Sequence, residues 1–232
     1  MKHKDLDISL ESIFAILPAK NEGTRIEPVL VSLQMQGIKN IIVVNDGSDD
    51  NTKDVVNKYR GIIVLDHIIN LGPGAATLTG VKYAMKNGAK YVVTLDADSQ
   101  HNPENIMSLV EHLEENELDL VIGSRFLQYN DIPFIRLIYN FFGNFISFLI
   151  TGVYLSDSQS GMKAMSQKFA KQLDISFDGF EFCIEIIKQA KIHNAKVGEI
   201  PIDVRYTADT MSKGQNFQTG LGMLLKLFNP FS

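Results

Sequence analysis

The sequence predicts an α/β protein built on a mostly parallel β-sheet with helices on both faces. Short runs of β-branched and other apolar residues alternate with longer segments whose apolar residues recur every three or four positions. The expected strands are four or five residues long and apolar on both faces, which is typical of parallel sheets buried between two helical layers. A chain of 232 residues can form one such domain, and we find no Pro/Gly/Ser-rich linker and no internal repeat.

The predicted elements follow one another regularly in the first part of the chain. Five strands are expected, at residues 13–17, 41–44, 62–65, 91–95 and 118–122. Helices are expected between them, at residues 24–36, 51–59, 75–86 and 103–115. After residue 126 the pattern changes to an apolar stretch, a helix near 180–191, a strand near 197–204 and a polar segment. We therefore expect a mixed C-terminal part, with a division near residues 1–126 and 127–232.

The composition and charge favour some classes of protein over others. Hydrophobic residues make up 45% and charged residues 21%, which fits a folded globular chain. The net charge of −5 disfavours a nucleic-acid partner. The single cysteine, Cys183, has no intramolecular partner, which indicates a reducing compartment. The first residues lack the apolar segment of a secretory signal, so we expect a cytoplasmic protein.

The segments that follow the predicted strands share a polar or glycine-rich character. They are residues 18–22, 45–48, 67–74, 96–98 and 123–125. Parallel sheets bind ligands at the carboxyl ends of their strands. The coincidence of five such segments predicts a ligand site at that edge.

Asp96 and Asp98 lie at the end of the fourth predicted strand. Alternate side chains of an extended segment point the same way, so the two carboxylates can converge on one cation, with Gln100 as a further oxygen ligand. Mg²⁺ prefers a few carboxylates together with substrate phosphates. A capped turn is the alternative. The strand-end position favours a metal–diphosphate site, with His101 as a surface or neighbouring residue rather than a ligand.

Two other loops have more than one interpretation. Asp46 could accept hydrogen bonds from a nucleobase or ribose, while Ser48 and Asp49 are expected to cap the next helix. Gly72 and Gly74 either allow the backbone to approach a phosphate or allow tight helix–strand packing. Neither a GxGxxG nor a P-loop motif is present, because Thr77 replaces the third glycine and no Gly-Lys-Ser/Thr follows.

Taken in order, these motifs resemble those of the family 2 glycosyltransferases, in particular the polyprenyl- or dolichyl-phosphate sugar synthases. The resemblance spans nearly the whole chain. The motifs that carry it lie at residues 18–22, 45–48, 70–76, 95–101, 123–126, 157–161, 199–202 and 212–213. It implies a GT-A fold, Rossmann-like with a mostly parallel sheet, a nucleoside diphosphate sugar as donor and a divalent cation, Mg²⁺ or Mn²⁺, as cofactor.

The resemblance also implies roles for individual residues. The donor-binding positions are Pro18, Ala19, Asn21, Glu22, Asp46, Gly72, Gly74 and Lys213. The cation and diphosphate positions are Asp96, Asp98 and Gln100. The acceptor positions are Arg125, Arg136 and Ser160, and the catalytic positions are Asp96, Asp98, Arg125, Asp157 and Arg205. Asn45 and Pro73 depart from the common pattern, so the base, uridine or guanosine, stays open.

The acceptor is the main open question. A lipid phosphate is already ionised near neutral pH and needs no strong general base. A sugar hydroxyl needs one, and Asp157 is the candidate, with a structural turn involving Ser158 and Ser160 as the alternative. We also keep two other classes open: an inactive nucleotide-sugar-binding protein and a nucleotidyltransferase.

The apolar stretch at residues 132–155 bears on the acceptor. Arg136, Asn140 and Asn144 interrupt it, which argues against a membrane-spanning helix. A packed core helix is the default for such a pattern. The family resemblance implies instead a helix near 133–152 that lies in the membrane interface beside a polyprenyl or dolichyl phosphate, and we expect this arrangement. The protein would then be peripheral on the cytoplasmic face of the membrane. The polar residues 205–218, including Arg205 and Lys213, are expected to form a lid over the donor diphosphate.

Overall fold

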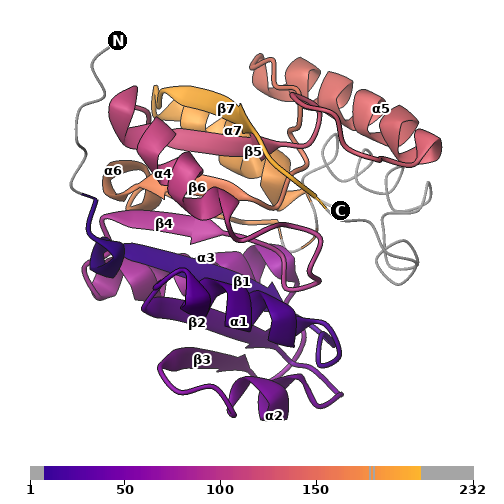
Figure 1. Ribbon diagram of the computed structural model, residues 1–232. Helices are drawn as coiled ribbons and strands as arrows, with labels where there is room; N and C mark the ends of the chain where they lie inside the picture. Colours follow the sequence, from indigo (N-terminus) through magenta and orange to yellow (C-terminus); the bar gives the residue numbers. More distant parts are fainter. Residues whose placement is uncertain (1–7, 178, 180, 205–232) are drawn as a thin grey trace.

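The α/β fold with a mostly parallel sheet is confirmed by the computed structural model (Figure 1). The structure describes residues 8–177, 179 and 181–204. The expected lid, with Arg205 and Lys213, lies outside the described residues. Within the described residues, seven strands form one sheet in the order β3-β2-β1-β4-β6-β5-β7.

Most elements lie where the sequence predicts them. The strands are β1 (Ile13–Ala19), β2 (Asn40–Asp46), β3 (Ile62–His67), β4 (Tyr91–Thr94), β5 (Leu120–Ser124), β6 (Lys163–Ser166) and β7 (Val197–Pro201). The helices are η1 (Leu10–Ser12), α1 (Ile26–Met35), α2 (Thr52–Val56), α3 (Pro73–Lys86), α4 (Asn105–Glu115), α5 (Phe134–Thr151), α6 (Gln167–Ala170) and α7 (Phe182–Ile192). The 3₁₀ turn η1, strand β6 and helix α6 are absent from the sequence prediction.

Strand β6 is the main difference from the predicted sheet. β1 pairs in parallel with both β2 and β4, and β5 pairs in parallel with β7. β6 lies between β4 and β5 and runs antiparallel to both, with Lys163 opposite Thr94 on one side and Ile122 on the other. The carboxyl ends of β4 and β5 therefore lie beside the start of β6.

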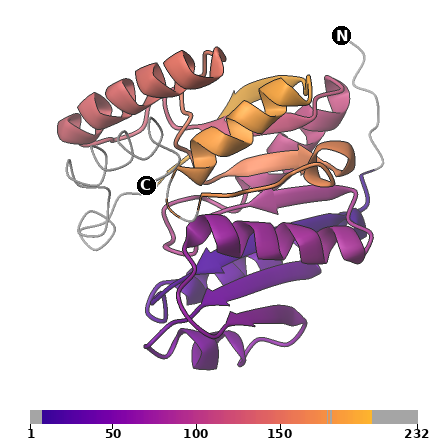
Figure 2. The same ribbon diagram turned by 180° about the vertical axis from the view of Figure 1, so that it is seen from behind.

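Two helical layers bury the sheet. Helices α1, α2 and α4 pack on one face, where Ile26, Val55 and Leu109 join the core formed with β1 (Figure 1). Helices α3, α6 and α7 pack on the other face, where Val81, Phe169 and Ile186 join the second core (Figure 2). This arrangement leaves the carboxyl edge of the sheet to the loops.

Helix α3 shows why glycines precede and interrupt it. Pro73 stands at its start, where the missing N–H costs nothing, and Gly72 before it has a φ of 93°, which favours glycine. A Cβ at Gly80 would lie 2.4 Å from the Ile16 side chain of β1. A Cβ at Gly74 would lie 2.0 Å from the carbonyl oxygen of Phe177. Close packing therefore explains Gly74 and Gly80.

The expected cap of the helix at 51–59 is wrong, and the helix is shorter. Helix α2 ends at Val56, and Asn51 at its N-cap makes no side-chain hydrogen bond there. Asp50 supplies the cap instead, because its Oδ1 accepts from the Thr52 N–H at 2.9 Å. Ser48 accepts from the Asn21 N–H, and Asp49 forms an ion pair with Lys20. These contacts join the loops after β1 and β2.

Helix α5 lies outside the two layers, beyond β5 and β7 (Figures 1 and 2). It runs from Pro133 at its N-cap to Gly152, whose φ of 69° ends the helix. Its buried residues are Ser147 and Thr151. Its apolar side chains with more than half of their surface exposed are Phe134, Ile135, Phe141, Phe142, Phe145 and Leu149. The alternative of a buried core helix is therefore wrong.

Length and hydropathy alone would allow α5 to cross a membrane, and within the described ranges it is the one helix that does so. Arg136, Asn140 and Asn144 recur every four residues and therefore share one face of the helix. The first two line a cleft in the body of the protein. α5 thus has a polar face toward the protein and an apolar face toward solvent.

The close contact at Gly80 yields a stability prediction. Gly80→Val places a branched side chain against Ile16, and such overpacking costs about 3 kcal/mol of unfolding free energy. The matched control is Lys82→Val, at an exposed position of the same helix, which we expect to change stability by about 0.5 kcal/mol. Urea denaturation measures both. Equal losses in the two variants would contradict the packing account.

Candidate functional site

A cleft of about 430 Å³ opens at the carboxyl edge of the sheet. It is lined by residues at or just after the carboxyl ends of β1, β2, β3, β4 and β5, and by residues from α3, from α5, from the segment before β6 and from the start of α7. Parallel strands bring these loops together, as expected from the polar segments at the strand ends. The cleft is therefore the candidate site.

Asp96 and Asp98 lie in the cleft beyond the end of β4. The turn between them and Gln100 is held by two contacts: the Gln100 N–H donates to Asp98 Oδ1 at 3.0 Å, and Ser99 Oγ donates to the Arg25 carbonyl at 2.6 Å. Ser99 has a φ of 65°, an uncommon conformation for a residue with a side chain. These contacts hold the turn that carries Asp98, and both carboxylates line the cleft.

The backbone at Gly161 packs closely against Asp96. A Cβ at Gly161 would lie 2.4 Å from each carboxylate oxygen of Asp96, so a side chain there would displace the carboxylate. Thr94 Oγ1 donates to the Gly161 carbonyl at 2.8 Å and holds this segment in place. The ligand set offers oxygen atoms, which Mg²⁺ and Mn²⁺ prefer. In the described part of the chain, no three His, Cys, Asp or Glu side chains converge as a closed metal site.

Surrounding protein raises the pKa of both carboxyls. Burial raises the pKa of Asp98, and the Asp96 charge raises it further. Burial raises the pKa of Asp96 as well, while the positive charges of Lys163 and Arg125 lower it. Half of the Asp96 side chain is nevertheless open to the cleft. A bound cation would favour the ionised forms of both groups.

His101 is a buried neighbour of the carboxylates, which is the second of the two positions expected from the sequence, and not a surface residue. Its side chain is 3% exposed, and its Nδ1 lies 3.3 Å from Asp96 Oδ2. Burial lowers the pKa of His101 to about 4, so the ring is neutral at physiological pH. His101 also forms an isolated antiparallel bridge with Val204, which places the end of the described chain beside the carboxylates.

Asp46 holds the glycine loop. Its carboxylate accepts from the N–H groups of Leu71 and Gly72, both at 2.8 Å, and lies 2.7 Å from His67 Nδ1. His67 Nε2 in turn lies 3.0 Å from Thr79 Oγ1. Asp46 is 2% exposed but lines the cleft. The residue thus shapes the loop, and the base contact expected for it stays a prediction.

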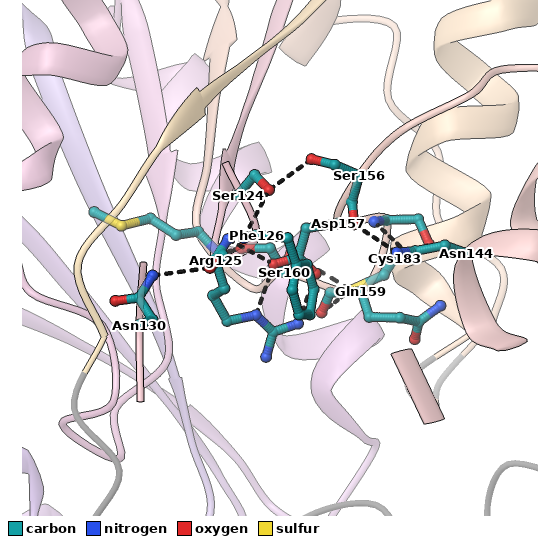
Figure 3. Close-up of polar contacts among 12 residues, drawn as sticks. Ser124, Arg125, Phe126, Asn130, Asn144, Ser156, Asp157, Gln159, Ser160 and Cys183 are labelled. Atoms are coloured by element: carbon teal, nitrogen blue, oxygen red, sulfur yellow. Dashed lines mark hydrogen bonds and ion pairs between the residues drawn. The ribbon is translucent and has the colours of Figure 1, made fainter. Parts of the chain in front are cut away.

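Arg125 and Asp157 form a buried ion pair (Figure 3). Arg125 Nε and one terminal nitrogen donate to the two carboxylate oxygens of Asp157, both at 2.6 Å, and the Arg125 N–H donates to Asp157 at 3.0 Å. Asp157 is fully buried and does not line the cleft, whereas Arg125 does. The expected role of Asp157 as a general base therefore does not fit its position, because its oxygens are bound by the arginine.

The remaining predicted residues divide into two groups. Those that line the cleft are Pro18, Ala19, Glu22, Asp46, Gly72, Asp96, Asp98, Gln100, Arg125 and Arg136. Asn21 and Gly74 do not line it; the side-chain oxygen of Asn21 instead accepts a hydrogen bond from the Asp49 N–H.

The prediction of Ser160 as an acceptor contact is wrong. Ser160 is fully buried, and its hydroxyl accepts from the Met162 N–H.

Several residues of the site were missed from the sequence. Arg25, which forms an ion pair with Glu22 at 2.6 Å, lines the cleft, as do Tyr139, Gln159 and Cys183. Asn140 could have been found, because it recurs four residues after Arg136. Lys163 is fully buried beside the cleft and donates to the Ser160 carbonyl and to Cys183 Sγ. Nothing in its sequence context distinguishes it from a surface lysine.

Comparisons with known proteins agree with the sequence resemblance. Residues 14–174 match the family model described as Glycosyl transferase family 2. An uncharacterised protein of Methanocaldococcus jannaschii is 40% identical over 226 residues, covering 95% of this chain and 93% of the relative. The UDP-N-acetylglucosamine–dolichyl-phosphate N-acetylglucosaminyltransferase of Methanococcus voltae is 34% identical over 236 residues, covering 93% and 94%.

A solved structure supports the fold. Glucosyl-3-phosphoglycerate synthase of Mycobacterium tuberculosis, in complex with Mn²⁺, UDP and phosphoglyceric acid, superposes with a TM-score of 0.68 at 17% identity. The match covers 94% of this chain and 79% of the mycobacterial chain.

Burial of His101 predicts a pH dependence of stability. Its pKa falls from about 6.5 in the unfolded chain to about 4 in the fold, so the folded state favours the neutral ring. The resulting stability, about 3 kcal/mol, is present above pH 6.5 and is lost as the pH falls toward 4. We expect His101→Gln to remove this part of the pH dependence, as measured by urea denaturation at pH 7.5 and 4.5 with a chelator present.

The control is His193→Gln, at an exposed position after α7, which should keep the pH dependence of the unmodified protein. A comparison of variants is needed because the raised pKa values of Asp96 and Asp98 act in the opposite sense. If His101→Gln and His193→Gln showed the same pH dependence, the neutral buried histidine would be disproved.

Proposed function

The chain belongs to glycosyl transferase family 2, and from this membership we propose that it transfers a hexose from a UDP-linked sugar to a polyprenyl or dolichyl phosphate, with inversion at the anomeric carbon. The observation that carries the proposal is the composition of the cleft. One wall presents the carboxylates of Asp96 and Asp98, and Arg125 and Arg136 line the same cavity. Arg136 belongs to a helix with an exposed apolar face.

The donor would occupy the part of the cleft lined by Pro18, Ala19 and Gly72. Asp96 and Asp98 would hold a divalent cation, which when bound supplies positive charge to the leaving diphosphate. The choice of cation rests on the oxygen ligands and agrees with the Mn²⁺ of the mycobacterial enzyme that shares the GT-A fold. UDP as the nucleotide is supported by the relative from Methanococcus voltae, which uses UDP-N-acetylglucosamine.

The acceptor would occupy the part of the cleft lined by the two arginines. A phosphate is an anion at neutral pH, and guanidinium groups are suited to binding phosphate oxygens. Such an acceptor attacks without prior removal of a proton, so no general base is needed. The hydroxyl-acceptor alternative needs a base, and the residue assigned to that role, Asp157, is buried and bound by Arg125. The geometry thus favours the phosphate.

Helix α5 supports a lipid-linked acceptor. Its exposed phenylalanines form an apolar surface, while Arg136, Tyr139 and Asn140 of the same helix line the cleft. A helix with one apolar and one polar face binds in the plane of a membrane interface. The phosphate of a polyprenyl chain held in that interface would then lie at the level of the arginines. We therefore also propose peripheral attachment to the membrane through α5.

The direct test is a transfer assay. The protein is incubated with Mn²⁺ or Mg²⁺, a panel of UDP- and GDP-sugars and polyprenyl phosphate, and sugar in the organic phase is measured. We expect lipid-dependent transfer from a UDP-sugar, reduced about a hundredfold or more by Asp98→Asn. Asp54→Asn, at an exposed position of α2, is the control and should retain activity. Nucleotide release with a hydroxyl acceptor alone would contradict the proposal.

Membrane attachment is tested with liposomes that contain anionic lipid. Phe141→Asp combined with Phe145→Asp places two charges one helical turn apart on the exposed face of α5 and should abolish sedimentation with liposomes. The matched control is Val31→Asp with Met35→Asp, which has the same spacing on the exposed face of α1. The attachment through α5 would be refuted by equal sedimentation of the two variants.

A further inference from the structure

We propose that Asn144 is a positioning residue that couples helix α5 to the guanidinium group of Arg125 in the cleft. The link runs from Asn144 to the loop of residues 156–158, and from Asp157 in that loop to Arg125 (Figure 3). The inference rests on the proposed function in taking Arg125 as a contact of the acceptor phosphate. The coupling itself can be measured without any substrate.

The first step is the contact between α5 and the loop. Asn144 Oδ1 accepts from the Ser158 N–H at 2.9 Å and from Ser158 Oγ at 2.8 Å. Asn144 Nδ2 donates to the Ser156 carbonyl. One amide side chain thus binds the loop on both sides of Asp157. The next residue toward the N-terminus, Gly143, lies close to Gln159, since a Cβ there would be 3.4 Å from its side chain.

The second step is the support on the opposite side of the loop. Glu199 of β7 accepts from the N–H and hydroxyl of Ser156, both at 2.9 Å, and from the Asp157 N–H at 3.1 Å. Ser156 Oγ also lies 2.6 Å from Ser124 Oγ at the end of β5. The sheet therefore fixes one side of the loop and α5 fixes the other, so its position depends on both.

The third step leads from the loop to the cleft. Asp157 binds Arg125 through both carboxylate oxygens, so the plane of the guanidinium group follows the position of the carboxylate. Asn130 Nδ2 donates to the Arg125 carbonyl at 2.8 Å and fixes the backbone independently of α5. The contribution of Asn144 is therefore to the direction of the Arg125 side chain.

The consequence concerns the apolar face of α5. Arg136, Asn140 and Asn144 share one face of the helix, and the exposed phenylalanines lie outside it. A shift of α5 on a lipid surface moves the amide of Asn144, and with it Asp157 and the Arg125 guanidinium. The arginine that binds the acceptor phosphate is thus oriented by the helix that contacts the lipid.

The coupling is tested first by NMR, without substrate. The chain has five arginines, so the Nε–H signal of Arg125 can be assigned by its absence in Arg125→Lys. We expect this signal to shift and to exchange faster with solvent in Asn144→Ala, because Asp157 no longer holds the guanidinium rigidly. Ser147→Ala, a buried position on the same face of α5 whose hydroxyl has no partner among the described residues, should leave the signal unchanged.

Kinetics provide the second measurement. In Asn144→Ala, kcat/KM for the lipid phosphate should fall about tenfold to a hundredfold, while the KM for the donor stays within about twofold. In an Arg125→Ala background the same change should have no further effect, because the two residues act through one contact. If Asn144→Ala does not fold, Ser158→Ala removes one of the three hydrogen bonds and should shift both readouts in the same direction, by less.

Two results would overturn the coupling: an Arg125 Nε–H signal in Asn144→Ala identical to that in Ser147→Ala, or an additive loss of acceptor kcat/KM in the double variant. Failure of the proposed function would give a different result from failure of the coupling. In that case the unmodified protein transfers no sugar to lipid phosphate, and the NMR comparison alone decides whether Asn144 orients Arg125.

Discussion

The antiparallel course of β6 between β4 and β5 determines how the site is assembled. A parallel strand in that position would begin at the opposite edge of the sheet. Because β6 starts at the carboxyl ends of its neighbours, the segment before it, residues 157–161, runs along the same edge as the polar loops. Gly161 therefore lies against Asp96, and Asp157 lies against Arg125. Both contacts depend on the antiparallel direction of β6.

The Arg125–Asp157 pair illustrates a general property of buried charges. Removing two ions from water is costly, and the attraction between them often does no more than offset that cost. The pair is therefore weak evidence for stability, but its bidentate geometry gives the guanidinium a defined direction. Asn144 and Glu199 accept hydrogen bonds from the loop on either side of the Asp157 carboxylate, and Asn130 holds the Arg125 backbone. We interpret this network as one that positions the guanidinium group of Arg125 for an anionic ligand.

Much of the fold could be predicted from the sequence because its signals are local. Apolar runs and helical periodicity located six of the seven strands, and the rule on strand ends located Asp96, Asp98 and Arg125 at one edge. Strand β6 was missed because Lys163–Ser166 includes a buried lysine and a serine, and only its neighbours make it a strand. Asp157 and Ser160 follow a motif of the family but are buried, and burial depends on packing between distant segments.

The orientation of α5 is a second feature that could not be predicted from the sequence alone. The sequence shows an apolar helix interrupted by polar residues, but not which face meets the protein. The structure places Arg136 and Asn140 at the cleft and leaves the phenylalanines exposed. A helix with this division connects an aqueous site to an apolar surface, and that connection is the physical basis for proposing a lipid-linked acceptor.

The most direct test of the central claim is a crystal structure of the protein with UDP, Mn²⁺ and a short-chain prenyl phosphate. We predict Mn²⁺ coordinated by the carboxylates at the end of β4, at about 2.0–2.3 Å from oxygen, together with the diphosphate. We predict the prenyl phosphate within hydrogen-bond distance of Arg125, with its chain directed along α5. A nucleotide bound away from Asp96 and Asp98, or a phosphate bound away from both arginines, would contradict the account.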